Sequence, residues 1–187
     1  MKPFRRRRRG TVTASFDLNE AQLIVNLTSQ VVELLQDRNG PSESEPDPLA
    51  QLIGMTGPAL PPEDPVLARL LPDAYRDAPD DAAEFRRFTE QSLSSAKVAN
   101  AHTVIETLEE GGLDVGSKHV EVELDDAQVM AWLRALTDVR LALAVRLGIE
   151  TDEDTARLAE SEDEATVAMG DVYDWLGFVQ ETLVHVA

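Results

Sequence analysis

The longest stretch of the chain that is apolar on nearly every side runs from Val120 to Ile149. Over 120–124 it alternates apolar residues with glutamate, which is the period-two pattern of a strand with one buried face. Over 126–148 the apolar residues surround the helical axis, and such a helix has to be covered by neighbours on several sides. We therefore expect the fold to be organised around this helix.

A similar strand-and-helix unit is predicted near the N-terminus. A short alternating hairpin about a glycine is followed by a helix over 19–38 with one apolar stripe. Asn19 and Gln22 stand in its N-cap and N3 positions. Residues 16–27 align with residues 122–133 at a constant offset of 106. We interpret the two segments as a structural pseudo-repeat whose strands pair in one small sheet.

Four further helices are predicted. Asp followed by Pro begins two short ones, over 49–53 and 66–71, because Asp caps the first amides and Pro fits the first turn. A long helix over 80–110 is ended by two glycines, and a last helix over 165–187 carries an apolar seam. We expect the long helix to pack closely along another helix through a face of mostly small residues. That face consists of Phe85, Phe88, Ser92, Ala96, Ala99 and Thr103.

Polar stretches separate these elements without dividing the chain into domains. Residues 39–47 are predicted to be a flexible linker, and the acidic residues 150–164 a solvated loop with one helical turn at 155–159. A chain of 187 residues is long enough to bury the core of a single domain, 1–187. The expected fold class is mainly α: a compact helical bundle around the central apolar helix. A small antiparallel β-sheet is expected from the N-terminal hairpin and the strand near 119–124.

Composition limits the chemistry of the chain. It contains no cysteine, which excludes disulfides, thiolate catalysis and cysteine-ligated metals within it and fits a reducing compartment. The basic start is not followed by the apolar core of a signal peptide, and no apolar run is long enough to span a membrane. We therefore expect a cytoplasmic protein without a membrane partner.

The net charge of −18 is unevenly distributed, because the first ten residues hold six of the 17 basic residues. The basic tract could contact the phosphates of a nucleic acid. It could instead be an edge strand whose charges prevent pairing with other sheets, or a clamp on the acidic body. We favour the second interpretation, since no interleaved aromatic residues or helix-turn-helix pattern accompany the tract. The candidate interaction residues are Arg5, Arg6, Arg7, Arg8 and Arg9.

Arg140 lies in an otherwise apolar row of the central helix. Burying a guanidinium without a partner would cost several kcal/mol, so we expect a carboxylate beside it. An ion pair that fixes helix register is the favoured interpretation, and a ligand-binding arginine is the alternative. The expected partners are Glu84, Glu90, Asp171 and Asp174.

Other charged and polar clusters do not form a catalytic pattern. Residues 84–90 alternate in charge, which is typical of a salt-bridged helical surface. The three histidines lack metal-ligand spacing, and the serines of the long helix have no adjacent base. We therefore expect no catalytic residue, no metal site and no cofactor.

Several short motifs resemble those of an actinobacterial domain-of-unknown-function family. They are Leu71-Pro72-Asp73-Ala74-Tyr75, Glu84 to Glu90, Trp132-Leu133, Asp138 to Leu141 and Arg146 to Ile149. The resemblance covers most of the chain and implies no activity and no site residues. Genes of that family lie beside the gene of the Clp-protease adaptor, and some members are labelled transcriptional regulators. The resemblance thus implies a role near regulated proteolysis.

The expected function is that of a non-enzymatic interaction or regulatory protein, with a link to regulated proteolysis that rests on that resemblance. A protein partner or a second copy of the chain is the expected partner. The alternative is a nucleic-acid-binding transcriptional regulator that uses the arginine tract. An enzyme of an unrecognised class is a third hypothesis.

Overall fold

The computed structural model describes residues 1–7, 10–38, 58, 60–75, 77–113 and 118–187. The linker predicted at 39–47 and the helix predicted at 49–53 lie outside this part of the chain. The described elements are β1 (Lys2–Arg6), β2 (Val12–Asp17), α1 (Leu18–Arg38), α3 (Pro65–Leu70), α4 (Pro79–Leu108), the π-helical turn η1 (Glu109–Leu113), β3 (His119–Leu124), α5 (Asp126–Leu147), α6 (Asp152–Ala159) and α7 (Glu164–Val184). The predicted fold class, mainly helical with a small antiparallel sheet, is confirmed.

The sheet is antiparallel with the strand order β1-β2-β3. β2 and β3 pair along their whole length, from Val12 opposite Leu124 to Asp17 opposite His119. The predicted pairing of the two strands that lead into helices is therefore confirmed. β1 forms one edge, and its pairing with β2 contains an irregularity between Lys2 and Arg5.

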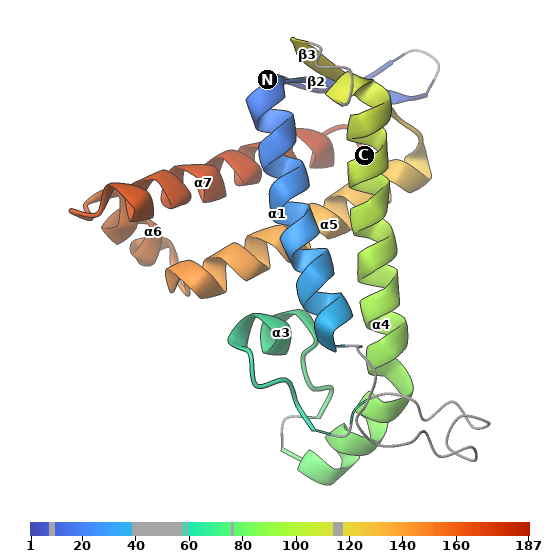
Figure 1. Cartoon of the computed structure of the whole chain (residues 1–187), viewed down its shortest axis with the longest axis vertical. Helices are drawn as coiled ribbons and strands as arrows, with labels where there is room; N and C mark the ends of the chain where they lie inside the picture. Colours follow the sequence, from blue (N-terminus) through green and yellow to red (C-terminus); the bar gives the residue numbers. More distant parts are fainter. Residues whose placement is uncertain (8–9, 39–57, 59, 76, 114–117) are drawn as a thin grey trace.

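Helix α5 is central, as its apolar surface predicted. It packs against α1, α3, α4, α7 and β3. In Figure 1, α1 and α4 run side by side, and α5 crosses them. The sheet lies at one end of α1 and α4, and α3 lies toward the other, while α6 and α7 extend to one side. The sheet and the N-terminal part of α4 therefore lie at opposite ends of the molecule.

The core is built around Trp132 of α5, which is fully buried. Its ring stacks on Phe16 at a centroid distance of 6.0 Å and meets the edge of Phe4 at 5.6 Å. The indole nitrogen donates a hydrogen bond of 2.9 Å to the hydroxyl of Thr107 on α4. Trp132 thereby joins α5 to the sheet through its buried ring and to α4 through its N–H, which has a hydrogen-bond acceptor in the core.

The helix caps correct the predicted alignment of the two strand-and-helix units. Asp17, not Asn19, caps α1: its side chain accepts from the Glu20 amide, and Glu20 accepts from the Asp17 amide. Asp125 and Gln128 form the predicted capping box of α5. The two caps are offset by 108 residues, and at this offset buried residues of α1 match buried residues of α5. The matched pairs are Ala21 and Val129, Ile24 and Trp132, Leu27 and Ala135, Val31 and Val139, and Leu35 and Leu143.

Two other expectations are wrong. The segment 150–164, predicted as a loop with one helical turn, contains the eight-residue helix α6, because Thr151 and Asp154 form a capping box at its start. The long helix α4 packs along α1 and α5, as expected, but the small-residue face predicted to make this contact is largely exposed, and the rings of Phe85 and Phe88 are 43% and 46% accessible. The glycines at the end of α4 close a π-helical turn, in which Gly112 takes a φ of 107°.

Candidate functional site

The buried face of the first half of α4 is charged. Arg86 and Glu90 are only 6% and 3% exposed, although the alternating charges of this segment predicted a solvated surface. The Glu90 carboxylate accepts a hydrogen bond of 2.8 Å from Nε of Arg38 on α1, and its other oxygen lies 3.6 Å from Nε of Arg86. Arg86 also pairs with Asp73, which follows α3. This buried charge network joins three separate segments of the chain.

The sequence contained one signal of this network. Arg86 and Glu90 are four residues apart and share a helix face with the buried small residues Ala82 and Ser94. A charged pair within a row of small residues can be covered by neighbouring elements. The countercharges on Arg38 and Asp73 are distant in sequence, so their contribution could not be predicted from this spacing.

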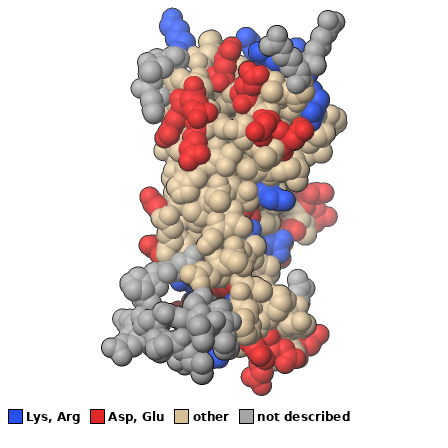
Figure 2. Space-filling model, turned by 90° about the vertical axis from the view of Figure 1, so that its right-hand side faces the viewer, with Lys and Arg blue, Asp and Glu red and all other residues tan. Residues whose placement is uncertain are grey.

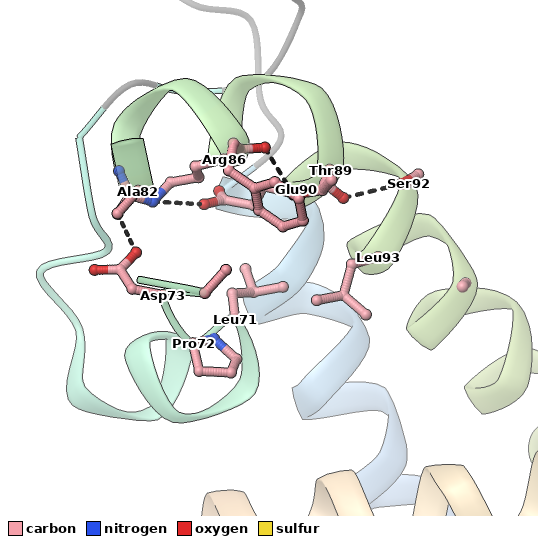
Figure 3. A pocket seen from close by; sticks show the side chains of 12 residues that line it. Leu71, Pro72, Asp73, Ala82, Arg86, Thr89, Glu90, Ser92 and Leu93 are labelled. Atoms are coloured by element: carbon pink, nitrogen blue, oxygen red, sulfur yellow. Dashed lines mark hydrogen bonds and ion pairs between the residues drawn. The ribbon is translucent and has the colours of Figure 1, made fainter. Parts of the chain in front are cut away.

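A groove of about 410 Å³ lies beside this network, between α4 and the residues that follow α3. Leu71 and Pro72 lie on one side of it and Leu93 on the other, while Arg86 and Glu90 point toward one another at its wall (Figure 3). The complete lining is Leu71, Pro72, Asp73, Ala74, Ala82, Phe85, Arg86, Thr89, Glu90, Ser92, Leu93 and Ala96. The groove has the size and the mixed apolar and polar lining of a binding site for a small group or a side chain.

Exposed apolar side chains gather at the same end of the molecule. Five of the eight large apolar residues that are exposed in the described chain belong to α4 or to the segments before it: Leu60, Tyr75, Phe85, Phe88 and Leu93. Single exposed apolar residues are common on protein surfaces, but a group of them beside a groove is typical of an interaction site. A carboxylate-rich surface continues from this group, and Figure 2 shows acidic side chains at this end of the molecule.

The described arginines of the tract lie at the opposite end of the molecule, with Arg5 and Arg6 on the edge strand β1 and Arg7 directly after it. Arg6 donates to Asp126 of α5 at 3.2 Å and to the Val186 carbonyl at 2.8 Å. Arg5 and Arg7 are exposed and line a hollow of about 690 Å³ that also contains two carboxylates of β3, Glu121 and Glu123. Arg8 and Arg9 lie outside the described residues. Arg5 and Arg6 thus occupy an edge strand, and Arg6 joins that strand to the acidic body.

Arg140 is partly buried between α5 and α7. Its Nη1 donates to the Gln180 side chain at 2.9 Å, and its guanidinium carbon lies 4.8 Å from the ring centroid of Tyr173. Gly177 allows this close approach, because a Cβ there would lie 3.3 Å from Nη2. None of the four expected carboxylates pairs with Arg140 among the described residues. The amide and the aromatic ring take the place of the carboxylate in this contact.

A second buried ion pair joins α4 to α5. The Lys97 ammonium donates to the Asp138 carboxylate, whose side chain is 7% exposed. Burial raises the pKa of Asp138 above its ordinary value, and the hydrogen bond and charge of Lys97 partly oppose that rise. Neither residue lines the groove, although Lys97 follows the lining residue Ala96, and the pair joins α4 to α5.

The described residues contain no group of three or more His, Asp or Glu side chains placed to hold a metal ion. Within the same part of the chain, no helix is long and apolar enough to cross a membrane.

Comparisons with known proteins give close sequence relatives. The chain is 36% identical over 182 residues to the oxidative stress regulator AosR of Mycobacterium tuberculosis, covering 90% of this chain and 78% of the relative. The oxidative stress regulator AosR of Mycobacterium bovis matches with the same identity and coverage. No solved structure matches. The model of the family described as a domain of unknown function, DUF2017, matches residues 1–187, and the chain belongs to this family.

Proposed function

We propose that this protein is a non-enzymatic regulator that binds a protein partner at the groove beside α4. The observation that carries the proposal is a groove with a buried charge network in its wall, which is lined by the exposed apolar residues Phe85 and Leu93 and adjoined by a hollow with Tyr75 and Phe88. A partner side chain in the groove would be desolvated against Leu71 and Leu93, which is the setting in which a few residues supply most of the binding energy.

The names of the relatives support a regulatory role. The two mycobacterial proteins are named oxidative stress regulators, and this chain spans 78% of their length. Because this chain has no cysteine, a regulatory response to oxidants could not depend on a thiol within it. We propose that the protein acts by binding a partner and that it is located in the cytoplasm. A link to regulated proteolysis rests on the family resemblance alone.

The buried charges suit a binding surface better than a catalytic one. Arg38, Arg86, Asp73 and Glu90 are engaged with one another, and their pairing stabilises the position of α4 relative to the segment after α3. A groove with rigid walls loses less conformational entropy when a partner binds. This supports preorganised binding without a chemical step.

The experiment is capture of partners from a lysate of the native host, with the wild-type protein and two matched variants. Leu93→Glu places a charge in the groove, and Met130→Glu places one at a similarly exposed apolar position on α5; the two residues are 40% and 45% exposed. We expect Leu93→Glu to lose a protein that the wild type and Met130→Glu both retain. Equal capture by all three would refute binding at the groove.

The alternative functions predict other results. A nucleic-acid-binding regulator would bind DNA or RNA at low salt, and changing Arg5 to Arg9 to serine would abolish that binding. The placement of Glu121 and Glu123 beside Arg5 and Arg7 weakens the attraction of this surface for phosphates. Light scattering of the wild type tests the remaining alternative, in which the partner is a second copy of the chain.

A further inference from the structure

A second hollow lies beside the groove, and its chemistry is distinctive. It has a volume of about 390 Å³ and is lined by three aromatic rings and two carboxylates: Tyr75, Phe85, Phe88, Asp81 and Glu84. Four of the five are on α4 at spacings of three and four residues, so they share one face of its first turns. We refer to these five residues as the aromatic-acidic pocket.

The three rings are open to solvent, and two of them are in contact. Tyr75 and Phe85 meet edge to face, with a centroid distance of 5.8 Å and an interplanar angle of 87°. Tyr75, Phe85 and Phe88 are each between 43% and 49% exposed. Ring faces of this kind attract a cation through their quadrupole, and the attraction increases as the cation is desolvated.

The two carboxylates add the charge that an aromatic site needs to select a cation. Among the described residues, neither Asp81 nor Glu84 forms an ion pair with a lysine or arginine. Two further exposed acids, Asp77 and Asp80, lie close by in the sequence. Carboxylates outnumber the exposed Arg87 on this surface, which therefore disfavours phosphates and carboxylates as ligands.

Among cations, a guanidinium fits this combination best. Its flat face stacks on aromatic rings while its N–H groups bind carboxylates in pairs, whereas an ammonium is a compact and strongly hydrated point charge. The pocket volume, about 390 Å³, is at the small end of the range of ligand sites. It therefore suits a side chain rather than a large ligand.

We propose that the aromatic-acidic pocket binds the guanidinium of an arginine on the protein partner. This inference rests on the proposed function. Phe85 lines both the pocket and the groove. The partner segment therefore carries an arginine and an apolar side chain close enough to lie on either side of one phenylalanine ring.

The test is a titration of the full chain with Nα-acetylarginine methylamide. Binding is monitored by the NMR signals of the ring protons of tyrosine and phenylalanine. The matched probe is the citrulline analogue, which has a similar shape and no charge. We expect saturable shifts of the Tyr75, Phe85 and Phe88 rings with the arginine probe. The citrulline analogue should bind about tenfold more weakly or less.

Two double variants test the carboxylates. Asp81→Asn with Glu84→Gln should weaken the arginine probe about tenfold. Glu109→Gln with Glu110→Gln makes the same charge change at exposed positions after the other end of α4 and should leave binding unchanged. Phe88→Leu removes an exposed ring and keeps an apolar side chain, so it should weaken the probe without unfolding the protein.

Several results would overturn the inference. Equal binding of the citrulline analogue would remove the role of charge. Equal binding of a third probe, Nα-acetyllysine methylamide, would remove the preference for a guanidinium over an ammonium. Equal weakening by the Glu109 and Glu110 double variant would show general attraction to an acidic protein. If the probe fails to bind while Leu93→Glu still abolishes partner capture, this inference fails and the proposed function stands. If the probe binds while Leu93→Glu has no effect on capture, guanidinium binding stands and the proposed function fails.

Discussion

Replacing Glu90 by glutamine tests whether the buried charge network holds the groove together. The change keeps the shape of the side chain and removes the one carboxylate that lies between Arg38 and Arg86. Two guanidiniums, whose side chains are 17% and 6% exposed, would then face an uncharged amide. Removing one partner from a buried ion pair destabilises a protein by about 3–5 kcal/mol, because the remaining charge is left buried.

The structure favours the lower end of that range. Arg86 keeps its pair with Asp73, and Arg38 keeps its hydrogen bond to the Leu60 carbonyl and some access to water. We therefore expect Glu90→Gln to lower the free energy of unfolding by about 3 kcal/mol. With an m-value of about 2 kcal/mol per molar urea for a chain of this size, the midpoint of unfolding would fall by about 1.5 M.

Urea unfolding, monitored by circular dichroism, measures this shift. The matched control is Glu84→Gln, which makes the same change at an exposed position on the same helix and should stay within about 0.5 kcal/mol of the wild type. Should Glu90→Gln shift the midpoint no more than Glu84→Gln does, the network contributes little and the reasoning is wrong. A double-mutant cycle with Arg38→Met then measures the coupling between Arg38 and Glu90 directly.

Three further predictions follow from other parts of the structure. Gly111→Ala should destabilise the protein by about 1–3 kcal/mol in urea unfolding, because the added Cβ would lie 2.6 Å from the carbonyl oxygen of Glu121. The control Gly170→Ala, whose Cβ would make only ordinary contacts, should not destabilise the protein. Because the pKa of Asp138 is raised in the folded state, the folded protein holds this proton more tightly than the unfolded chain does. The resulting contribution to the free energy of unfolding is complete below the ordinary pKa of Asp138 and is lost as pH rises through the raised pKa. Wild-type stability relative to Asp138→Asn should therefore increase from pH 7 to pH 4, and the opposite trend would contradict this assignment. Hydrogen bonds from the backbone amides of Glu150 and Thr151 hold the pKa of Asp154 at about 2. Protection of the α6 amides from hydrogen exchange should therefore persist above about pH 4 and decline toward pH 2. In Asp154→Ala this protection should be lost at every pH.

Part of the candidate site could have been found in the sequence. Phe85 and Phe88 were recognised as members of one helix face, and Asp73 and Tyr75 lie in a motif that resembles the family. The pattern assigns the phenylalanines to the packed side of the helix and Glu90 to a salt-bridged surface or to a pair with Arg140, whereas the structure exposes both rings and buries Glu90 against Arg38. Apolar residues are usually buried and carboxylates exposed, and the sequence pattern carried no information on which elements would cover which face of this helix.

The sequence by itself determined most of the described elements, with α6 as an exception, and the pairing of β2 with β3. Both follow from local patterns: period-two alternation over the strands, and an apolar surface around α5 that neighbours have to cover. The alignment of the two strand-and-helix units was two residues out, because Asp17 and Asn19 are both good capping residues. The choice between them depends on where the strand ends.

Only the tertiary structure decided which face of α4 is buried. Arg86 and Glu90 can lie in the interior because Arg38 and Asp73 supply opposite charges beside them, and Arg38 is 52 positions from Glu90 in the chain. With those charges neutralised, the polar face of α4 turns inward and its phenylalanines turn outward. Charge pairing between distant segments is a property of the folded arrangement, so periodicity could not predict the surface where we place the function.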